Sequence, residues 1–303
     1  MLILSVQIII NSIIAASVYA LFAASFSLIY STVRFFHLSH GAIFTVGAYA
    51  GYTVVTSPWI EFLPLSDSFI YLAAVLFGAF TCAIMGVLVD WIVYRPLRES
   101  RASALILLLA SFGVFVVIQN IIALIYGNQL RSVRLGPINR GIDLFGATVT
   151  PFQFVIVFVA LGFFAILGYI HRRTRIGRFV RAVADDRYLA RITGIDSERV
   201  ITVSFAAGSA LVGIAGVLIA FETNLEPSMG FEILLKGIVA VIVGGIGSIP
   251  GAYLGALLVG AIENVVAWFL PSVWQDPILF SFLLIVLLVR PNGILGQTKP
   301  RRD

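Results

Sequence analysis

Three ionisable side chains stand within long apolar stretches and are the first candidates for chemistry in this sequence: Asp90, Lys236 and Glu263. A charge inside a bilayer is costly, so such residues usually pair or line a path for a solute or a proton. Glu263, beside Asn264, lies past the middle of its stretch, which makes these two residues candidates for a solute pathway. A structural carboxylate is the alternative. Lys236 follows Glu232 by four residues, so these two can pair near the outer surface.

The sequence holds few ingredients for catalysis. His37 and His40 lie together in one short connection and His171 lies at another membrane edge, and none has a plausible set of metal ligands nearby. The pattern Gly-x-x-x-x-Gly-Lys-Ser/Thr is absent, so the chain has no P-loop of its own for ATP. We therefore expect a protein that is not an enzyme and that carries no metal and no cofactor of its own.

The apolar character of the chain indicates its fold class. Hydrophobic residues make up 60% and charged residues 12% of the sequence, with a mean hydropathy of +1.03, whereas an average soluble domain is about 45–50% apolar and about 25% charged. We predict an all-α, polytopic transmembrane bundle forming one domain over residues 1–303. The net charge of +5 comes from arginines in short loops beside apolar spans, which the positive-inside rule explains without nucleic acid. Cys82 stands alone, which excludes an intrachain disulfide.

Apolar stretches near or above the roughly 20 residues of a membrane-crossing helix predict about nine spans, within a range of about eight to ten. They cover residues 3–31, 41–57, 68–89, 102–126, 151–170, 200–221, 233–247, 251–270 and 278–289. The second, seventh and ninth are short and adjoin Gly or Pro, which is typical of discontinuous helices near a midplane site. The first lacks the basic residues that open a secretory signal, so we expect it to remain as a helix.

The distribution of charges predicts which loops face outward. Segments 57–67 and 222–232 carry acids and no base and should lie outside, whereas the arginines of 95–101, loop 172–199 and the basic tail 299–302 belong inside. The N-terminus is then outside and the C-terminus inside. Asp90 lies close to Arg95 and to an inner edge. The outer loop 127–150 is an exception, with three arginines and one acid, and we expect a small ordered hairpin there.

Glycine-rich segments mark candidate gates of a solute pathway. In the first half the candidates are His40, Gly41 and Tyr49, and in the second half Gly244, Gly245, Gly247, Pro250 and Gly251. The two segments match loosely, which leaves an internal repeat open. Gly247, Gly251 and Gly255 recur every fourth residue, and on one helix they form a stripe for close packing. The stripe is either a packing seam only, or the link from Gly244 to Gly251 is an inner hinge or gate.

The longest inner loop, 172–199, carries the most informative pattern. Between Gly177 and Gly194 there is no glycine or proline, so we predict one short helix parallel to the membrane, with Gly194 as its C-terminal cap. The adjacent acids Asp185 and Asp186 can pair with neighbouring arginines. One alternative is an amphipathic helix on anionic lipid, but its two central acids would be repelled there. Docking into a groove of another protein is therefore favoured.

At this loop the sequence resembles the permease subunits of ATP-binding-cassette importers for branched-chain amino acids. The matching positions of the loop are Gly177, Arg178, Arg181, Ala182, Asp185, Asp186, Ala190, Gly194 and Ile195. Other matches, spread over essentially the full length, are His40-Gly41 with Gly47-Ala48-Tyr49, Tyr94 to Arg98, Gly244 to Gly251 and Arg290 to Gly296. His37 is a departure, because the family often has Asn a few residues before the His-Gly pair.

The resemblance implies a transport subunit whose loop positions form a short cytoplasmic coupling helix on an ATPase subunit. It also implies two cytoplasmic ATPases that bind ATP and magnesium, a second and related permease subunit, and an external solute-binding protein. The membrane would be the plasma membrane of a bacterium or archaeon, the inner one if Gram-negative. The cargo would be branched-chain amino acids, moved inward by alternating access. Two alternatives stay open: the same machinery carrying urea or short amides, and an ion-coupled secondary transporter or a channel.

Overall fold

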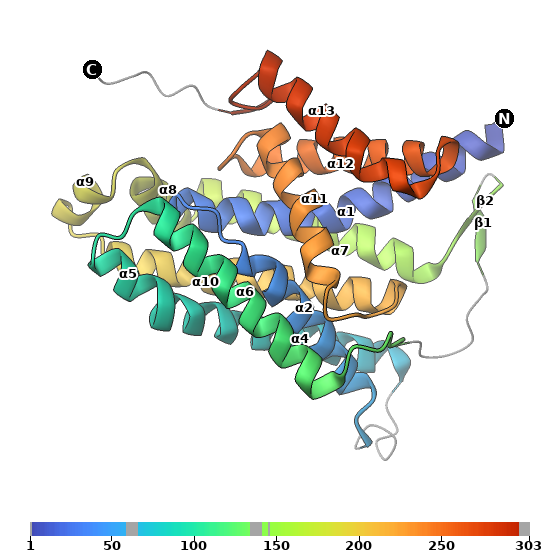
Figure 1. The fold of residues 1–303 in the computed structure, drawn as a ribbon, viewed down its shortest axis with the longest axis horizontal. Helices are drawn as coiled ribbons and strands as arrows, with labels where there is room; N and C mark the ends of the chain where they lie inside the picture. The colour runs from blue at the N-terminus through green and yellow to red at the C-terminus, as the bar shows by residue number, and fades with distance from the viewer. Residues whose placement is uncertain (1, 59–65, 134–140, 145, 297–303) are drawn as a thin grey trace. The chain divides into compact units, whose positions relative to one another are not determined.

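The computed structural model describes residues 2–58, 66–133, 141–144 and 146–296, and these are almost entirely helical (Figure 1). The helices are α1 (Leu2–Val33), α2 (Ser39–Val55), α4 (Asp67–Val89), α5 (Arg95–Glu99), α6 (Ala104–Tyr126), α7 (Pro151–Arg173), α8 (Arg175–Asp185), α9 (Arg187–Ile192), α10 (Ser197–Glu222), α11 (Met229–Gly244), α12 (Ile249–Phe269) and α13 (Gln275–Val289). The other elements are a π-helical segment η1 (Asp90–Tyr94), a 3-10 turn η2 (Ser272–Trp274) and the strands β1 (Ile142–Leu144) and β2 (Ala147–Val149). The basic tail 299–302 and most of segment 57–67 lie outside the described residues.

Seven helical segments of the described residues are long and apolar enough to cross a membrane, which confirms the polytopic all-α class. Helix α2, with 17 residues, and α11, with 16, are shorter, and both are spans that the sequence predicts as short. The last span is not short, because η2 and α13 together give an 18-residue segment. Pro277 does not delay its start, since a proline in the first turn of a helix removes no hydrogen bond.

Helix α4 also extends further than the sequence predicts. It continues through η1 and α5, so that one helical segment of 33 residues runs from Asp67 to Glu99. The predicted inner loop that begins after Val89 is therefore helical over its first ten positions. A π segment inserts one residue into a helix and shifts the register of everything that follows it. This shift decides which side chains meet at the inner end.

The small hairpin expected between α6 and α7 is present in the described part of that loop. Strands β1 and β2 pair antiparallel, with Ile142 opposite Val149. The turn uses Gly146, whose φ is +87°, and the carboxylate of Asp143 accepts its N–H at 2.6 Å. The side-chain carbonyl of Gln7, on α1, accepts the N–H of Thr148 at 2.9 Å. A side chain of α1 thus holds the hairpin in place.

Contacts divide the chain into two compact units, each discontinuous in sequence. The α12 unit consists of Met1–Ser27, Asn139–Gly168 and Leu235–Asp303, and the α10 unit of Leu28–Ile138 and Tyr169–Leu234. Three of the boundaries, after Ser27, Gly168 and Leu234, fall inside the helices α1, α7 and α11 and not in linkers. No shift in composition along the sequence could therefore have located them.

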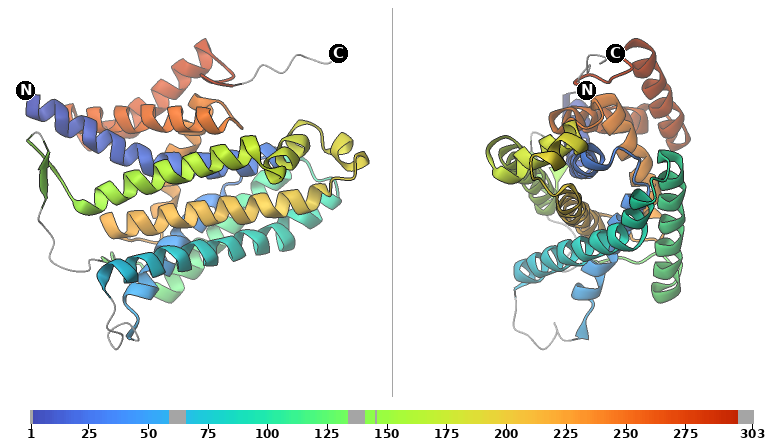
Figure 2. Two further views of the ribbon diagram at one scale, coloured as in Figure 1. Left: turned by 180° about the vertical axis from the view of Figure 1, so that it is seen from behind. Right: turned by 90° about the vertical axis from the view of Figure 1, so that its left-hand side faces the viewer.

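In the α10 unit, α10 runs alongside α4 and also packs on α2 (Figure 2). Glycines allow the backbones to approach closely. A Cβ added to Gly47 of α2 would lie 2.6 Å from the Cα of Gly213 on α10. On the α4 side, Gly86 leaves room for the side chain of Ser209 on α10. Such contacts supply the dispersion energy that holds helices together where lipid removes the hydrophobic driving force.

In the α12 unit, α11 and α12 meet along a seam of small residues. Gly244 faces Gly251, and Gly255 faces Ala240, with no room for a Cβ at any of the three glycines. Gly247 is outside this seam, because it lies in the turn between the helices with a φ of +81° and open space around it. The packing interpretation of the predicted stripe therefore holds for Gly251 and Gly255 and is wrong for Gly247.

The turn between α11 and α12 is held from two sides. The hydroxyl of Ser248 caps α12 by accepting the N–H of Gly251 at 3.1 Å, and Pro250 occupies the first turn. The N–H groups of Ile294 and Leu295 donate to carbonyls at the end of α11, each at 2.9 Å. The link is thus a packed connector in this structure, and its action as a hinge stays a prediction.

The contact of α2 with α10 predicts a strong dependence on Gly47. Gly47→Ala should lower the free energy of unfolding by about 1–3 kcal/mol, because its methyl group meets the backbone of Gly213. Gly113→Ala, on α6 with open space around it, is the matched control and should be neutral or stabilising by up to about 1 kcal/mol. Thermal unfolding of both variants in detergent measures the difference. Equal melting temperatures would contradict the close contact.

Candidate functional site

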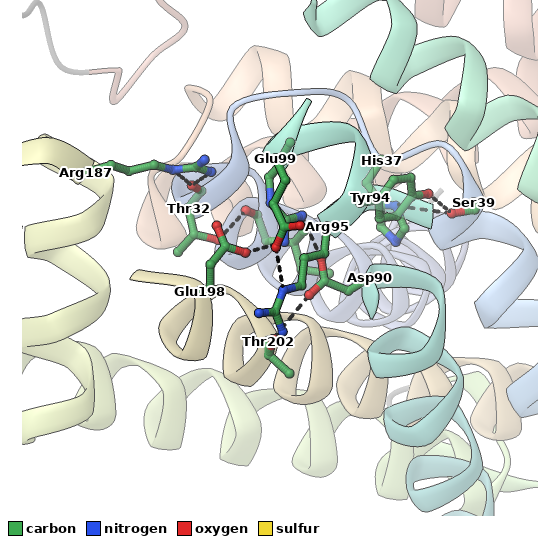
Figure 3. A network of polar contacts seen from close by, with 12 residues as sticks. Thr32, His37, Ser39, Asp90, Tyr94, Arg95, Glu99, Arg187, Glu198 and Thr202 are labelled. Atoms are coloured by element: carbon green, nitrogen blue, oxygen red, sulfur yellow. Dashed lines mark hydrogen bonds and ion pairs between the residues drawn. The ribbon is translucent and has the colours of Figure 1, made fainter. Parts of the chain in front are cut away.

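A buried ion network joins the end of the long α4 segment to α10 at the predicted inner end of the α10 unit (Figure 3). Arg98 donates from Nη1 to Asp90 at 2.6 Å and from Nη2 to Glu198 at 2.8 Å. The second carboxylate oxygen of Asp90 accepts the hydroxyl of Thr202 at 3.2 Å. The side chains of Arg98 and Asp90 are 6% and 1% exposed, so water screens their attraction little.

The π segment η1 explains why Arg98 reaches Asp90. In an α-helix, residues seven positions apart share one face. A π segment adds one residue, so across it the residue that shares this face is eight positions away. Arg95, although closer in sequence to Asp90, pairs instead with Glu99 at 3.1 Å on an exposed surface. Asp90 is therefore a structural partner of Arg98, a buried arginine for which the sequence predicts a position in a loop.

A second polar group surrounds Tyr94, the last residue of η1. Its hydroxyl lies 2.6 Å from Oγ of Ser39 and 3.1 Å from Nδ1 of His37. The N–H of Ser39 donates to the hydroxyl of Ser111 at 3.0 Å. Burial lowers the pKa of His37 to about 3, so the ring is neutral at physiological pH. A neutral imidazole offers both a donor and an acceptor nitrogen, and the amide of the Asn that the resemblance would place there likewise offers donors and an acceptor.

Loop 172–199 contains two short helices, where the sequence predicts one. The backbone of Asp186 leaves the helical region, with a φ of −151° and a ψ of 114°. Its carboxylate accepts the N–H groups of Tyr188 and Leu189, at 2.8 and 3.1 Å. Asp186 is thus the N-cap of α9. The prediction of a single helix is wrong because this aspartate competes for the backbone and starts a new helix.

The end of α9 is the predicted glycine cap. Gly194 has a φ of +87°, and the N–H of Ile195 donates to the carbonyl of Ala190 at 3.0 Å. The nine family positions of the loop differ in burial: Gly177 and Ala190 are buried, Arg181, Ala182, Asp186 and Ile195 are half-buried, and Arg178, Asp185 and Gly194 are exposed.

Arginine contacts anchor this loop to the end of α1. Nε of Arg187 donates to the carbonyl of Thr32 at 3.0 Å, and Arg34 donates to the carbonyl of Ala184. Figure 3 shows Arg187 and Thr32 beside Glu198 of the ion network. The free surface of α8 and α9 carries large exposed apolar side chains: Ile176, Phe179, Tyr188, Leu189 and Ile192. The loop is therefore fixed to the end of α1 and carries exposed apolar side chains among exposed arginines.

Glu263 is fully engaged in the α12 unit. Nζ of Lys236 donates to its carboxylate at 2.6 Å, and the hydroxyl of Tyr19 donates to its other oxygen. Lys236 and Glu263 are 6% and 15% exposed, so each charge stabilises the other in a poorly solvated place. Asn264 is not part of this group, because its amide donates to the carbonyl of Gly260 at 2.9 Å. These contacts favour the structural interpretation of Glu263.

The remaining gate candidates fall into two groups. His40, Gly41 and Tyr49 are buried residues of α2 in the α10 unit. A Cβ on Gly41 would lie 2.9 Å from the Cβ of Leu234. The backbone of α2 at Gly41 therefore lies very close to the first part of α11. The second group, from Gly244 to Gly251, lies in the connector of the α12 unit. The gate candidates thus belong to both units, and their part in a solute pathway stays a prediction.

Comparison with known proteins assigns these features to a family. The profile of a family described as branched-chain amino acid transport system / permease component matches residues 8–289. The chain belongs to this family. Among its relatives, the high-affinity branched-chain amino acid transport system permease protein LivH of Salmonella typhimurium is 32% identical over 95% of this chain and 94% of its own length. The corresponding permease BraD of Pseudomonas aeruginosa is 30% identical over 96% and 95%.

A solved structure supports the fold of this permease. PsaBC from Streptococcus pneumoniae, in complex with Fab, superposes with a TM-score of 0.50 over 93% of this chain and 91% of that chain. The sequence identity is 13%, so the likeness concerns the fold alone. The permease is a multi-pass membrane protein by its family and by the seven apolar helical segments of its described residues.

Several partners of the buried charges in the permease were not predicted from the sequence. Glu198 and Thr202 are four residues apart and so lie on one face of α10, a spacing that is visible in the sequence. Arg98 could not be assigned to Asp90, because a π segment leaves no clear pattern in composition. Tyr19, the second partner of Glu263, is one of several polar residues in the long helix α1, and nothing in the sequence distinguishes it. Only the fold brings it to α12.

The ion network predicts very different costs for two nearby arginines. Arg98→Gln should lower the free energy of unfolding by about 3–5 kcal/mol, because it leaves a buried carboxylate without its cation. Arg95→Gln breaks an exposed pair, 41% and 63% accessible, and should cost at most about 1 kcal/mol. Thermal unfolding in detergent compares the two. A loss for Arg98→Gln no larger than that for Arg95→Gln would show that the buried pair is not important for stability.

Proposed function

We propose that this permease is one of two membrane subunits of an ATP-binding-cassette importer that carries branched-chain amino acids into the cell. The observation that supports this most is the family match along nearly the whole chain. Relatives that match over 94–95% of their own length are named as branched-chain amino acid permeases. The exposed apolar surface of α8 and α9 is the place where a cytoplasmic ATPase would bind.

The contacts of the loop suggest how movement of the ATPases reaches the spans. Two cytoplasmic ATPases bind ATP and magnesium and move α8 and α9 when they close. Arg187 transmits this movement to α1 through Thr32, and α10 begins three residues after Gly194. Glu198 then carries it through Arg98 to α4. Net transport requires that the ATPases bind the inward-open and outward-open states with different free energies.

The remaining parts of the proposal follow from the family. A second, related permease subunit completes the pathway, and an external solute-binding protein delivers the cargo. The complex would lie in a bacterial or archaeal plasma membrane. An ion-coupled secondary transporter is not favoured, because a relay needs titratable groups that are free to exchange protons. In the described residues Asp90 and Glu263, the carboxylates in apolar spans, are each paired with a base.

The cap of α9 offers a direct test of coupling. Asp186→Ala removes the cap, which costs about 1 kcal/mol, and should lower leucine transport per ATP hydrolysed by about fivefold while hydrolysis continues. Asp186→Asn keeps the capping oxygen and should couple normally. Leucine uptake and ATP hydrolysis are measured together in proteoliposomes that contain the whole complex. Normal coupling in the Ala variant would contradict this role, and uncoupling in the Asn variant would assign it to the charge.

The cargo and the machinery are tested by reconstitution. Purification from the native membrane in mild detergent should bring down a P-loop ATPase, and the complex with its binding protein should accumulate leucine, isoleucine and valine when ATP is supplied. Urea and acetamide are the matched alternative cargoes. Accumulation of these in place of leucine would overturn the amino acid assignment, and leucine uptake by the chain without any ATPase would favour the solitary transporter.

A further inference from the structure

Three tyrosines and one arginine gather at the predicted outer end of the α10 unit. The ring centroids of Tyr49 and Tyr126 are 4.7 Å apart, and that of Tyr52 lies 6.3 and 6.1 Å from them. The guanidinium carbon of Arg131 lies 5.4 Å from the centroid of the Tyr52 ring. These four residues, which we name the outer cluster, come from α2, from α6 and from the loop after α6.

Arg131 is held in place but keeps donors to spare. Its Nε and Nη2 donate to the carbonyl of Tyr126 at 3.0 and 2.5 Å, and its Nη1 donates to the hydroxyl of Tyr52 at 2.7 Å. A guanidinium has five N–H donors, and these contacts use three. The other two have no acceptor among the described residues. A fixed arginine with a free edge is the group that binds a carboxylate best.

Tyr49 provides a second, independent indication of a ligand. The residue is 1% exposed, yet its hydroxyl has no hydrogen-bond partner within the described part of the chain. Tyr126, its neighbour in the outer cluster, has one, because its hydroxyl lies 2.6 Å from that of Thr53. A buried hydroxyl without a partner is costly, so native structures usually supply one. A bound solute would do so here.

A carboxylate lies close to the outer cluster. Arg131 and Leu225 exchange both backbone hydrogen bonds, at 3.0 and 2.7 Å, which ties the loop after α6 to the segment after α10. Glu226 follows Leu225 directly, so its backbone lies next to the residue that pairs with Arg131. Its side chain is half-buried and makes no hydrogen bond or ion pair to a described residue. Arg131 and Glu226, a cation and an anion that can each form further hydrogen bonds, therefore lie at the same end of the unit.

We propose that the outer cluster and Glu226 form a binding site for the charged head of a free amino acid on its way into the permease. Arg131 and the hydroxyl of Tyr49 donate to the α-carboxylate, and Glu226 and the tyrosine rings attract the α-ammonium group. The proposal rests on the proposed transport of amino acids. It also explains why an arginine stands in an outer loop, where the positive-inside rule does not favour one.

Binding of three related small molecules tests the assignment of each group. The purified complex, without its binding protein, is titrated by calorimetry with leucine, with leucinamide, which lacks the carboxylate, and with 4-methylpentanoate, which lacks the ammonium group. Arg131→Gln should lower the affinity for leucine and for 4-methylpentanoate at least about tenfold, because the loss of a charged contact changes a binding constant by that factor. The affinity for leucinamide should not change. Glu226→Gln should lower the affinity for leucine and for leucinamide and leave the affinity for 4-methylpentanoate unchanged.

Matched variants separate binding from folding. Tyr49→Phe should lower the affinity for leucine, whereas Tyr253→Phe, a similar change in the α12 unit, should not. Tyr52→Phe removes one bond of Arg131 but keeps its charge, so it should affect leucine less than Arg131→Gln does. No leucine binding by the unmodified complex, or equal affinity in all variants, would overturn the proposal.

A docking role for the binding protein would give a different result. If Arg131→Gln and Glu226→Gln weaken the affinity of the complex for the solute-binding protein and leave that for leucine unchanged, the outer cluster is a contact for that protein and the proposal is wrong. Leucine uptake by the unmodified complex is measured in parallel. Its absence would overturn the proposed function, whereas its presence with unaffected variants would overturn this inference alone.

Discussion

A charge buried in a membrane protein must be paired, and the predicted inner end of this permease is organised by one such pairing. Arg98 binds Asp90 and Glu198 at once, so α4 cannot move away from α10 without separating charges where water does not compensate them. The loop with α8 and α9 leads directly into α10, and its arginine contacts hold it to the end of α1. Through Glu198, near the start of α10, the network also fixes one end of this loop.

Along the spans the helices are held by another physical principle. Lipid offers apolar side chains an environment as favourable as the protein interior, so helix association depends on close packing and on polar contacts. Gly47 against Gly213, and Gly255 against Ala240, bring backbones into direct contact. Arg98 at one end of the α10 unit and Arg131 at the other supply the polar contacts. Arg98 binds to α10 and Arg131 to α2, and these two helices pack on each other.

The candidate site was predictable where local chemistry decides it. Gly194 is a helix cap because a positive φ suits glycine, and the family positions of the loop are legible from residue type and order. The break at Asp186 was not foreseen, since an aspartate in a run of helix formers can either pair with arginines or cap a new helix. The partners of Asp90 and Glu263 were not foreseen either, because they come from distant segments.

The sequence by itself determined the membrane class, the short α2 and α11, the hairpin and the family, because hydropathy, breakers and motif order are local properties of the chain. Tertiary structure alone decided which charges meet, since the π segment at Asp90 shifts the register of Arg98. It also moved Gly247 out of the predicted stripe and brought Arg131 to three tyrosines. These outcomes depend on how helices pack, and packing joins residues whose separation in sequence carries no signal.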